Sequence, residues 1–158
     1  MGLDSQLNIR LAKLSDLEKI NNFWWRLINE QKKHDDRILD SDTNMHRSMT
    51  FLRDRISQGG LYVSEIMPYG IVGLGSAAQD LHFLQTKINI WNISDIWVKK
   101  DFRRRGFASK MVSYLENICF EKGAEEIRLT VYSDNESAFE LYKSLEYSSK
   151  IITFSKLL

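Results

Sequence analysis

The spacing of hydrophobic residues changes along the chain, and each change of period predicts a new element. Residues 7–13 alternate between apolar and polar side chains, which is typical of a strand. Apolar residues then recur at helical spacing from Leu17 onward, and this predicts a helix that runs to about Lys33. Ser15 and Glu18 match a capping box at the start of that helix.

The same signals predict the later elements. In chain order they are a helix over 45–56, strands over 61–66 and 70–78 that form a hairpin, a long strand over 88–98, a helix that ends at Gly123, a strand over 127–132, a helix over 135–145 and a final strand over 147–154. The resulting element order is β-α-α-β-β-β-α-β-α-β.

This order restricts the topology of the sheet. A strand–helix–strand unit spans Ile90 to Val131, and such a crossover joins parallel strands. The hairpin before it is antiparallel. We therefore expect a single α/β or α+β domain over residues 1–158, with a mixed, mostly antiparallel sheet flanked by helices.

The long strand over 88–98 contains an irregularity. Its apolar alternation changes phase at Trp91 and returns to the first phase at Ile96. One extra residue in the strand, a β-bulge, produces such a slip. Burial of both faces of the strand produces it too, and the sequence leaves both interpretations open.

Charge and cysteine content exclude several classes of protein. The net charge is +1, so no overall positive field attracts nucleic acid. Cys119 is the only cysteine, which excludes an internal disulfide and a thiolate metal cluster, and its helical position predicts an inert thiol in the core. No apolar run reaches the length of a membrane span, and the N-terminus lacks the pattern of a signal peptide. We therefore expect a cytoplasmic protein that uses no metal.

The strongest candidate for chemistry is a cationic turn between strand 88–98 and the next helix. Residues 99–105 carry Arg103, Arg104 and Arg105, and Gly106 follows immediately before the helix. A helix N-terminus offers unpaired N–H groups to anions, and arginines strengthen the positive field there. This pattern indicates a phosphate site, with a solvated loop as the alternative. The chain has neither a P-loop nor a G-x-G-x-x-G motif.

The turn and a second segment resemble the GNAT superfamily of N-acetyltransferases. Arg103-x-x-Gly106-x-Ala108 matches that family's [QR]-x-x-G-x-[GA] signature. Residues 129–142 resemble its V-x-x-x-N-x-x-A-x-x-x-Y segment, with Asn135 and Tyr142 at the polar positions. The resemblance implies transfer of an acetyl group from acetyl-CoA directly to a primary amine.

The resemblance also implies which residues bind the cofactor. Main-chain groups of Ile96 and Val98, on either side of Trp97, correspond to those that pair with the pantetheine arm. Asn135 corresponds to a cofactor contact, although asparagine is also a favoured helix N-cap. The remaining expected contacts surround the pyrophosphate, through amides from Arg104 to Ser109 and nearby cations: Arg103, Arg104, Arg105, Gly106, Phe107, Ala108, Ser109 and Lys110.

Tyr142 and Asp95 are the expected catalytic residues. Tyr142 matches the family's general acid, which protonates the departing thiolate, and its alternative role is that of a core tyrosine. Asp95 lies on the strand beside the expected thioester and is the candidate base, because only an unprotonated amine attacks. Its alternative role is pairing with a nearby arginine. His82 and Glu65 are weaker candidates for the base.

The acceptor is predicted less sharply. The segment after the first helix is acidic, and Trp24 and Trp25 precede it. Carboxylates and indole faces both favour cations, so a small cationic amine is expected, with a solvated acidic loop as the alternative. The acidic residues are Asp35, Asp36, Asp40 and Asp42. A protein N-terminus or lysine as acceptor, a non-catalytic coenzyme A-binding domain and a homodimer remain open.

Overall fold

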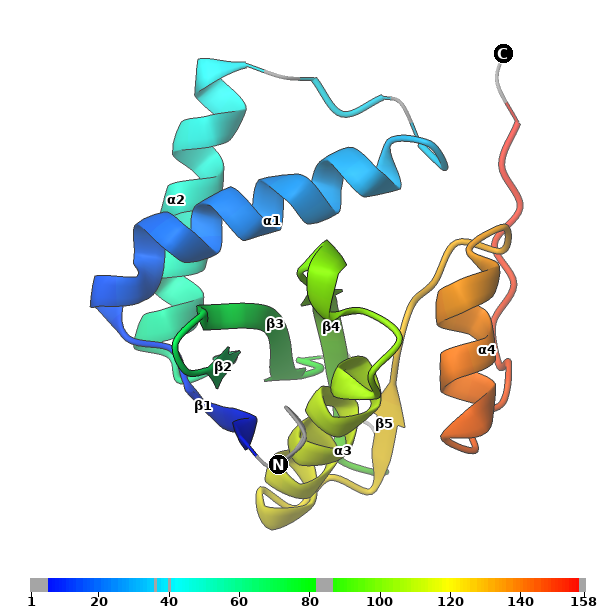
Figure 1. Ribbon diagram of the computed structural model, residues 1–158. Helices are drawn as coiled ribbons and strands as arrows, with labels where there is room; N and C mark the ends of the chain where they lie inside the picture. Colours follow the sequence, from blue (N-terminus) through cyan, green and yellow to red (C-terminus); the bar gives the residue numbers. More distant parts are fainter. Residues whose placement is uncertain (1–5, 36, 40, 82–86, 157–158) are drawn as a thin grey trace.

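The computed structural model describes residues 6–35, 37–39, 41–81 and 87–156 and contains a five-stranded sheet in the order β1-β2-β3-β4-β5 (Figure 1). Its elements are β1 (Asn8–Leu11), the 3-10 turn η2 (Leu14–Asp16), α1 (Leu17–Gln31), α2 (Asp42–Ser57), β2 (Leu61–Ile66), β3 (Gly70–Gln79), β4 (Ile90–Val98), the 3-10 turn η3 (Lys100–Phe102), α3 (Phe107–Glu121), β5 (Glu126–Arg128) and α4 (Glu136–Ser144).

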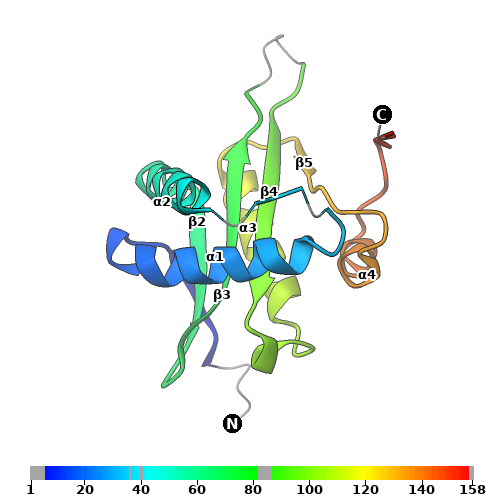
Figure 2. The same cartoon turned by 90° about the horizontal axis from the view of Figure 1, so that it is seen from above.

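Helices cover both faces of the sheet. On one face, Ile20 of α1 and Leu52 of α2 pack against Val63 and Leu74 of the central strands. On the other face the buried residues include Met111 and Leu115 of α3. Helix α4 stands apart, beyond β5 (Figures 1 and 2). The two-sided core confirms the predicted sheet flanked by helices.

The sheet is mixed as predicted. Strands β1 to β4 pair antiparallel with their neighbours, whereas β4 and β5 pair parallel. Helix α3 is the crossover between these two parallel strands. The β4–β5 pairing is short, because it extends only from Ile90 opposite Glu126 to Asn92 opposite Arg128.

A β-bulge interrupts β4, and this confirms one interpretation of the phase slip. Leu74 pairs with Trp97 and Ser76 with Ser94, so Asp95 and Ile96 together oppose the single residue Gly75. Asp95 has a φ of 56° in the left-handed region. Burial on both faces also occurs, because adjacent residues are buried at each end of β4.

Gly75 explains how the bulge fits beneath α3. A Cβ atom at Gly75 would lie 2.9 Å from the side chains of both Ile96 and Met111. The absent side chain therefore leaves the space into which the bulged strand and α3 pack.

Three local predictions are wrong. The helix start is not capped by Ser15 and Glu18. Instead the Asp16 carboxylate accepts the Lys13 N–H at 2.8 Å, so the capping interaction lies two residues earlier than predicted. The strand expected over 127–132 is only Glu126–Arg128.

The third wrong prediction is the final strand over 147–154, which is irregular. Ile151, Ile152 and Phe154 are 72%, 77% and 92% exposed. β-propensity alone does not form a strand, because its backbone groups need a ladder and its apolar face needs cover.

The turn after α4 retains the conformation that glycine normally provides there. Glu146 has a φ of 67°, and Tyr147 N–H donates to Tyr142 O at 3.0 Å. A left-handed residue after a helix satisfies the last carbonyl groups. Glu146 therefore takes this position despite its side chain.

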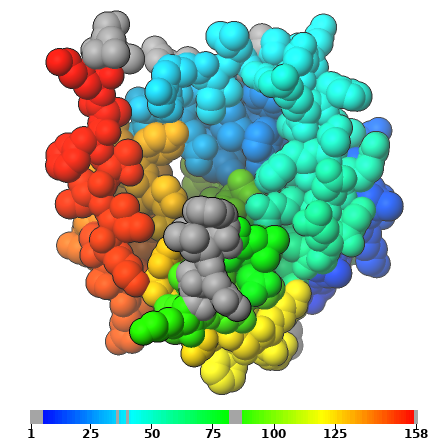
Figure 3. All heavy atoms as spheres, turned by 180° about the vertical axis from the view of Figure 1, so that it is seen from behind, coloured from blue at the N-terminus to red at the C-terminus, as the bar shows by residue number. Residues whose placement is uncertain are grey.

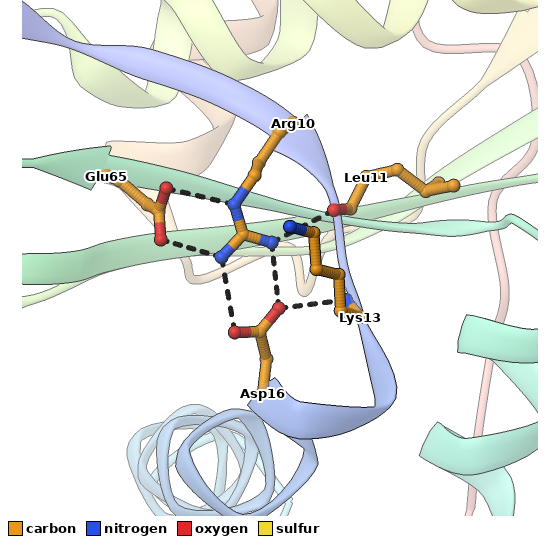
Figure 4. A network of polar contacts seen from close by, with 5 residues as sticks. All are labelled: Arg10, Leu11, Lys13, Asp16 and Glu65. Carbon is orange, nitrogen blue, oxygen red and sulfur yellow. Dashed lines mark hydrogen bonds and ion pairs between the residues drawn. The ribbon is translucent and has the colours of Figure 1, made fainter.

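A charged cluster joins β1, β2 and the start of α1 (Figure 4). The Arg10 guanidinium donates to Glu65 at 2.6 and 2.9 Å and to Asp16 at 2.8 and 3.2 Å. These hydrogen bonds are the main reason why the pKa values of both carboxyl groups lie below their usual range. Arg10 thus links the edge of the sheet to the beginning of α1.

We predict that Glu65→Gln lowers the free energy of unfolding at pH 7 by about 1 kcal/mol, a modest value because water screens the partly exposed pair. A carboxyl group with a lowered folded-state pKa stabilises the fold above its unfolded pKa and ceases to do so as the pH falls. The difference from wild type should therefore shrink between pH 5 and pH 3, measured by urea unfolding. The exposed Glu18→Gln is the control, and an equal loss at both pH values would contradict the explanation.

Candidate functional site

The site begins where β4 separates from β5. Pairing ends at Asn92, so the later part of β4 has no β5 partner among the described residues. Lys99 N–H donates to Val72 O on β3 at 2.7 Å. Because backbone groups alternate in direction along a strand, those of Ile96 and Val98 face the open edge, away from β3.

The open edge of β4 leads to the N-terminus of α3. Gly106 is the N-cap residue with a φ of 75°, and no side chain caps the helix. The first helical bond runs from Lys110 N–H to Gly106 O, so the N–H groups of Phe107, Ala108 and Ser109 precede the ladder. A Cβ atom at Gly106 would meet no atom within 4 Å. This glycine-led turn can therefore admit an anion directly against its amides.

The three arginines of the turn point in different directions. Arg104 has a φ of 61° and is exposed, as is Arg105, whose guanidinium lies over the Phe102 ring. Arg103 instead donates to both Glu30 carboxylate oxygens, at 2.6 and 2.8 Å. Its Nε donates to Val98 O at 2.7 Å. The structure thus directs Arg103 toward α1 and β4, away from the expected anion site.

Two other residues expected at the cofactor lie mainly in the core. Trp97 is 4% exposed and stacks on Phe23, with ring centroids 5.1 Å apart. Phe107 is 2% exposed in a cluster with Phe102 and Val98. Phe107 therefore reaches the turn only through its backbone, and the ring anchors the first turn of α3.

Asp95 lies in the bulge and accepts three hydrogen bonds. Its Oδ2 accepts from Ser76 Oγ at 2.7 Å and from Ser94 Oγ at 3.2 Å, and its Oδ1 accepts from Trp24 Nε1 at 3.2 Å. No arginine pairs with it among the described residues, in contrast to the alternative role considered from the sequence. The carboxylate is therefore held in a fixed orientation between α1 and the two central strands.

Helix α4 carries the other two expected site residues. Asn135 is its N-cap, and the Asn135 side chain accepts from Ala138 N–H at 3.4 Å, as expected of a capping asparagine. Tyr142 is half-buried beside Tyr147, and burial raises the pKa of Tyr142 above its usual value. No hydrogen-bond partner of the Tyr142 hydroxyl is found within the described part of the chain.

The acidic segment after α1 is less available to a cation than expected. Arg37 donates to both carboxylate oxygens of Asp35, at 2.7 and 2.5 Å. This pairing is the main cause that lowers the pKa of Asp35 to about 2. Asp42 is exposed in the first turn of α2. Asp36 and Asp40 lie outside the described residues, as does His82.

The indoles and the last candidate base also have definite positions. Trp25 is buried and donates to Ser48 Oγ at 2.9 Å, which leaves Trp24 as the indole nearest Asp95. Glu65 is bound to Arg10, far along the sheet from the bulge. Asp95 and Glu65 are the two candidate bases that the structure describes, and of these Asp95 lies at the open edge of β4.

Sequence reasoning missed several residues of the site. Ser76 orients Asp95, and Gly75 admits the bulge, but neither belongs to a motif that we recognised. The signal was present as two glycines, Gly73 and Gly75, inside a predicted strand, because interior glycines often mark a bulge or a close approach.

Other features lie away from this site. Cys119 is fully buried, and burial raises the pKa of its thiol to about 11. A cavity of about 200 Å³ lies at the opposite end of β4, lined in part by Arg55, Trp91 and Lys122. Within the described residues, no helix is long and apolar enough to cross a membrane and no group of three His, Cys, Asp or Glu residues is placed to hold a metal ion.

Solved acetyltransferases share this fold. A predicted acetyltransferase with acetyl-CoA from Clostridium acetobutylicum has a TM-score of 0.77 at 15% identity, with 96% of each chain covered. Glucosamine-6-phosphate N-acetyltransferase from Arabidopsis thaliana has a TM-score of 0.69 at 21% identity, covering 96% of this chain and 97% of that one. The likeness identifies an acetyltransferase fold.

The chain belongs to the acetyltransferase (GNAT) family, whose family model matches residues 17–147. The resemblance inferred from the two motifs is thereby confirmed. Thialysine N-epsilon-acetyltransferase of Bos taurus is 36% identical over 53 residues, which make up 34% of this chain and 31% of that protein. The chain thus matches about a third of the length of this curated relative.

We predict that Gly106→Ala and Gly70→Ala each destabilise the protein by about 1 kcal/mol, because both positions have left-handed φ and open space around the missing Cβ. Only Gly106→Ala should also weaken binding of inorganic pyrophosphate, by about tenfold, since its methyl group would enter the space beside the amides. Isothermal calorimetry and thermal unfolding measure the two effects. Equal pyrophosphate affinities of the two variants would rule out the turn as the anion site.

Proposed function

We propose that this protein is an acetyl-CoA-dependent N-acetyltransferase that transfers an acetyl group directly to a primary amine. The separation of β4 from β5 carries the proposal, because it leaves backbone groups of Ile96 and Val98 beside the uncapped N-terminus of α3. An extended arm and a pyrophosphate are the two features of coenzyme A that such an edge and such a turn would recognise.

The residues present fit this ligand. Open space at Gly106 and the unpaired N–H groups of Phe107, Ala108 and Ser109 suit the pyrophosphate, with Arg104 and Arg105 supplying positive charge nearby. The pantetheine arm would lie along the open edge of β4, like an added strand. Arg103 already occupies Val98 O, so we assign the arm to the groups of Ile96 and to the Val98 N–H.

Bound acetyl-CoA supplies an activated acetyl group as a thioester. Asp95 accepts the proton that the attacking amine must lose, and its three hydrogen-bond donors fix the carboxylate for this task. Tyr142 donates its phenolic proton to the sulfur as the C–S bond breaks. The raised pKa of Tyr142 supports this role, because the phenol remains protonated at neutral pH.

The proposed acceptor is a small cationic amine. Trp24 presents an indole directly bound to Asp95, and an aromatic face next to a carboxylate attracts a cation. Asp35 contributes less than the sequence indicated, because Arg37 neutralises it. A protein amine is the second candidate, and the relative whose name specifies an N-epsilon-acetyltransferase favours a lysine-like acceptor group in either case. A cytoplasmic location and a homodimeric state also remain proposals.

We predict that Tyr142→Phe lowers kcat for acetyl transfer about 100-fold, since a positioned general acid contributes at least this factor. The KM for acetyl-CoA should change little, because the phenol acts on the leaving sulfur. Thiol release from acetyl-CoA, measured with polyamines, amino acids and lysine-containing peptides, provides both values. Coenzyme A binding by the wild type without turnover on any amine would favour the non-catalytic alternative.

Asp95→Asn is the variant to compare with Tyr142→Phe in this assay. The amide oxygen can still accept from Trp24, and the serine hydroxyls can rotate to accept from the amide N–H groups. Its rate should fall at neutral pH and recover as the pH approaches the pKa of the amine, because the free amine then forms without a base. The rate of Tyr142→Phe should not recover in this way. Identical pH profiles for the two variants would contradict the assigned roles.

A further inference from the structure

Helix α4 carries Asn135 and Tyr142, yet it is weakly attached to the rest of the domain. None of its residues is fully buried. Beyond its C-terminal end, Tyr147 Oη donates to Glu116 Oε1 on α3 at 2.7 Å. Figures 1 and 2 show α4 apart from the helices that cover the sheet. Polar contacts at its two ends therefore contribute much of its attachment to the domain.

At the N-terminal end that contact comes from His34. Its side chain is 5% exposed, and Nδ1 lies 2.7 Å from Asp134 Oδ2, in the turn immediately before Asn135. The imidazole also stacks on Tyr132, with ring centroids 5.4 Å apart and planes 16° from parallel. His34 follows α1, so this contact joins two residues that are 100 positions apart in sequence.

The contact depends on the charge of His34. The two atoms are close but out of line with the ring N–H, and neither ring nitrogen makes a hydrogen bond within the described residues. The contact is an ion pair when the imidazole is protonated. His34 is the main cause that lowers the pKa of Asp134. The other charged or titratable groups around the pair are Tyr132, Lys33, Asp35 and Arg37.

The location gives the contact a consequence for the site. Figure 3 shows an opening between the segment that leads into α4, in orange, and α1, in blue. The contact between His34, which follows α1, and Asp134, which precedes α4, joins these two segments. Asn135 is the next residue along the chain, and Tyr142 lies two turns further along the same helix.

We propose that His34 is a positioning residue for acetyl transfer. Its imidazole holds Asp134, and through it the N-terminus of α4, so that Asn135 and Tyr142 face the open edge of β4. This inference rests on the proposed function, because the position of Tyr142 matters only if Tyr142 donates a proton.

Hydrogen exchange tests the attachment without relying on activity. In His34→Gln at pH 6, protection factors of amides in residues 138–144 should fall roughly three- to five-fold, the range measured for partly exposed ion pairs. His46→Gln, on the exposed surface of α2, is the control and should behave as wild type.

Steady-state kinetics tests whether His34 positions the residues of α4. His34→Gln and Asp134→Asn should each lower kcat about three- to five-fold at pH 6, and the double variant should be no worse than either alone, as for partners in one interaction. Unchanged amide protection factors in α4 of an active His34→Gln variant would contradict the attachment of α4 through His34. Changed protection with unchanged kcat would overturn the positioning role. If the wild type acetylated no amine, the proposed function would be contradicted. The protection factors would still show whether His34 attaches α4.

Discussion

The left-handed bulge at Asp95 is the constraint on which the site depends. A non-glycine residue with a φ of 56° costs roughly 1–2 kcal/mol relative to an ordinary strand conformation. Ser76, Ser94 and Trp24 offset that cost by donating hydrogen bonds to the Asp95 carboxylate. The bulge bends β4, and Gly75 leaves the room for it beneath α3. A strand bent in this way leaves its parallel neighbour after Asn92 and keeps an unpaired edge.

The parts of the site differ in how firmly the fold holds them. The turn before α3 is anchored by the buried Phe102 and Phe107 rings, and Asp95 is fixed by three donors. Helix α4 depends on polar contacts at its ends, because none of its residues is fully buried. The elements proposed to bind the phosphates are therefore anchored in the core, while the helix that carries the proposed acid has no buried residue, which is typical of segments that open locally. Such a division suits an enzyme that must admit and release a large cosubstrate.

The sequence predicted well those features that depend on local chemistry. The phase slip in residues 88–98 indicated a bulge as one of two open interpretations, and Asn135 was recognised as a possible helix cap. The parallel β4–β5 pair followed from the strand–helix–strand crossover between them. The failures concern partners that are distant in the chain. Glu30 draws Arg103 away from the turn, and Arg37 neutralises Asp35. No local pattern indicates that residues 147–154 lack a neighbouring strand.

Amide exchange at the open edge of β4 tests the central claim most directly. On addition of coenzyme A, the amides of Ile96 and Val98 should exchange more slowly, because they would acquire acceptors from the pantetheine arm. The amide of Trp97, which faces β3, serves as an internal reference and should not change. Slower exchange at Ile96 and Val98 alone is the result that we predict. Coenzyme A binding that leaves both amides unaffected would contradict the account.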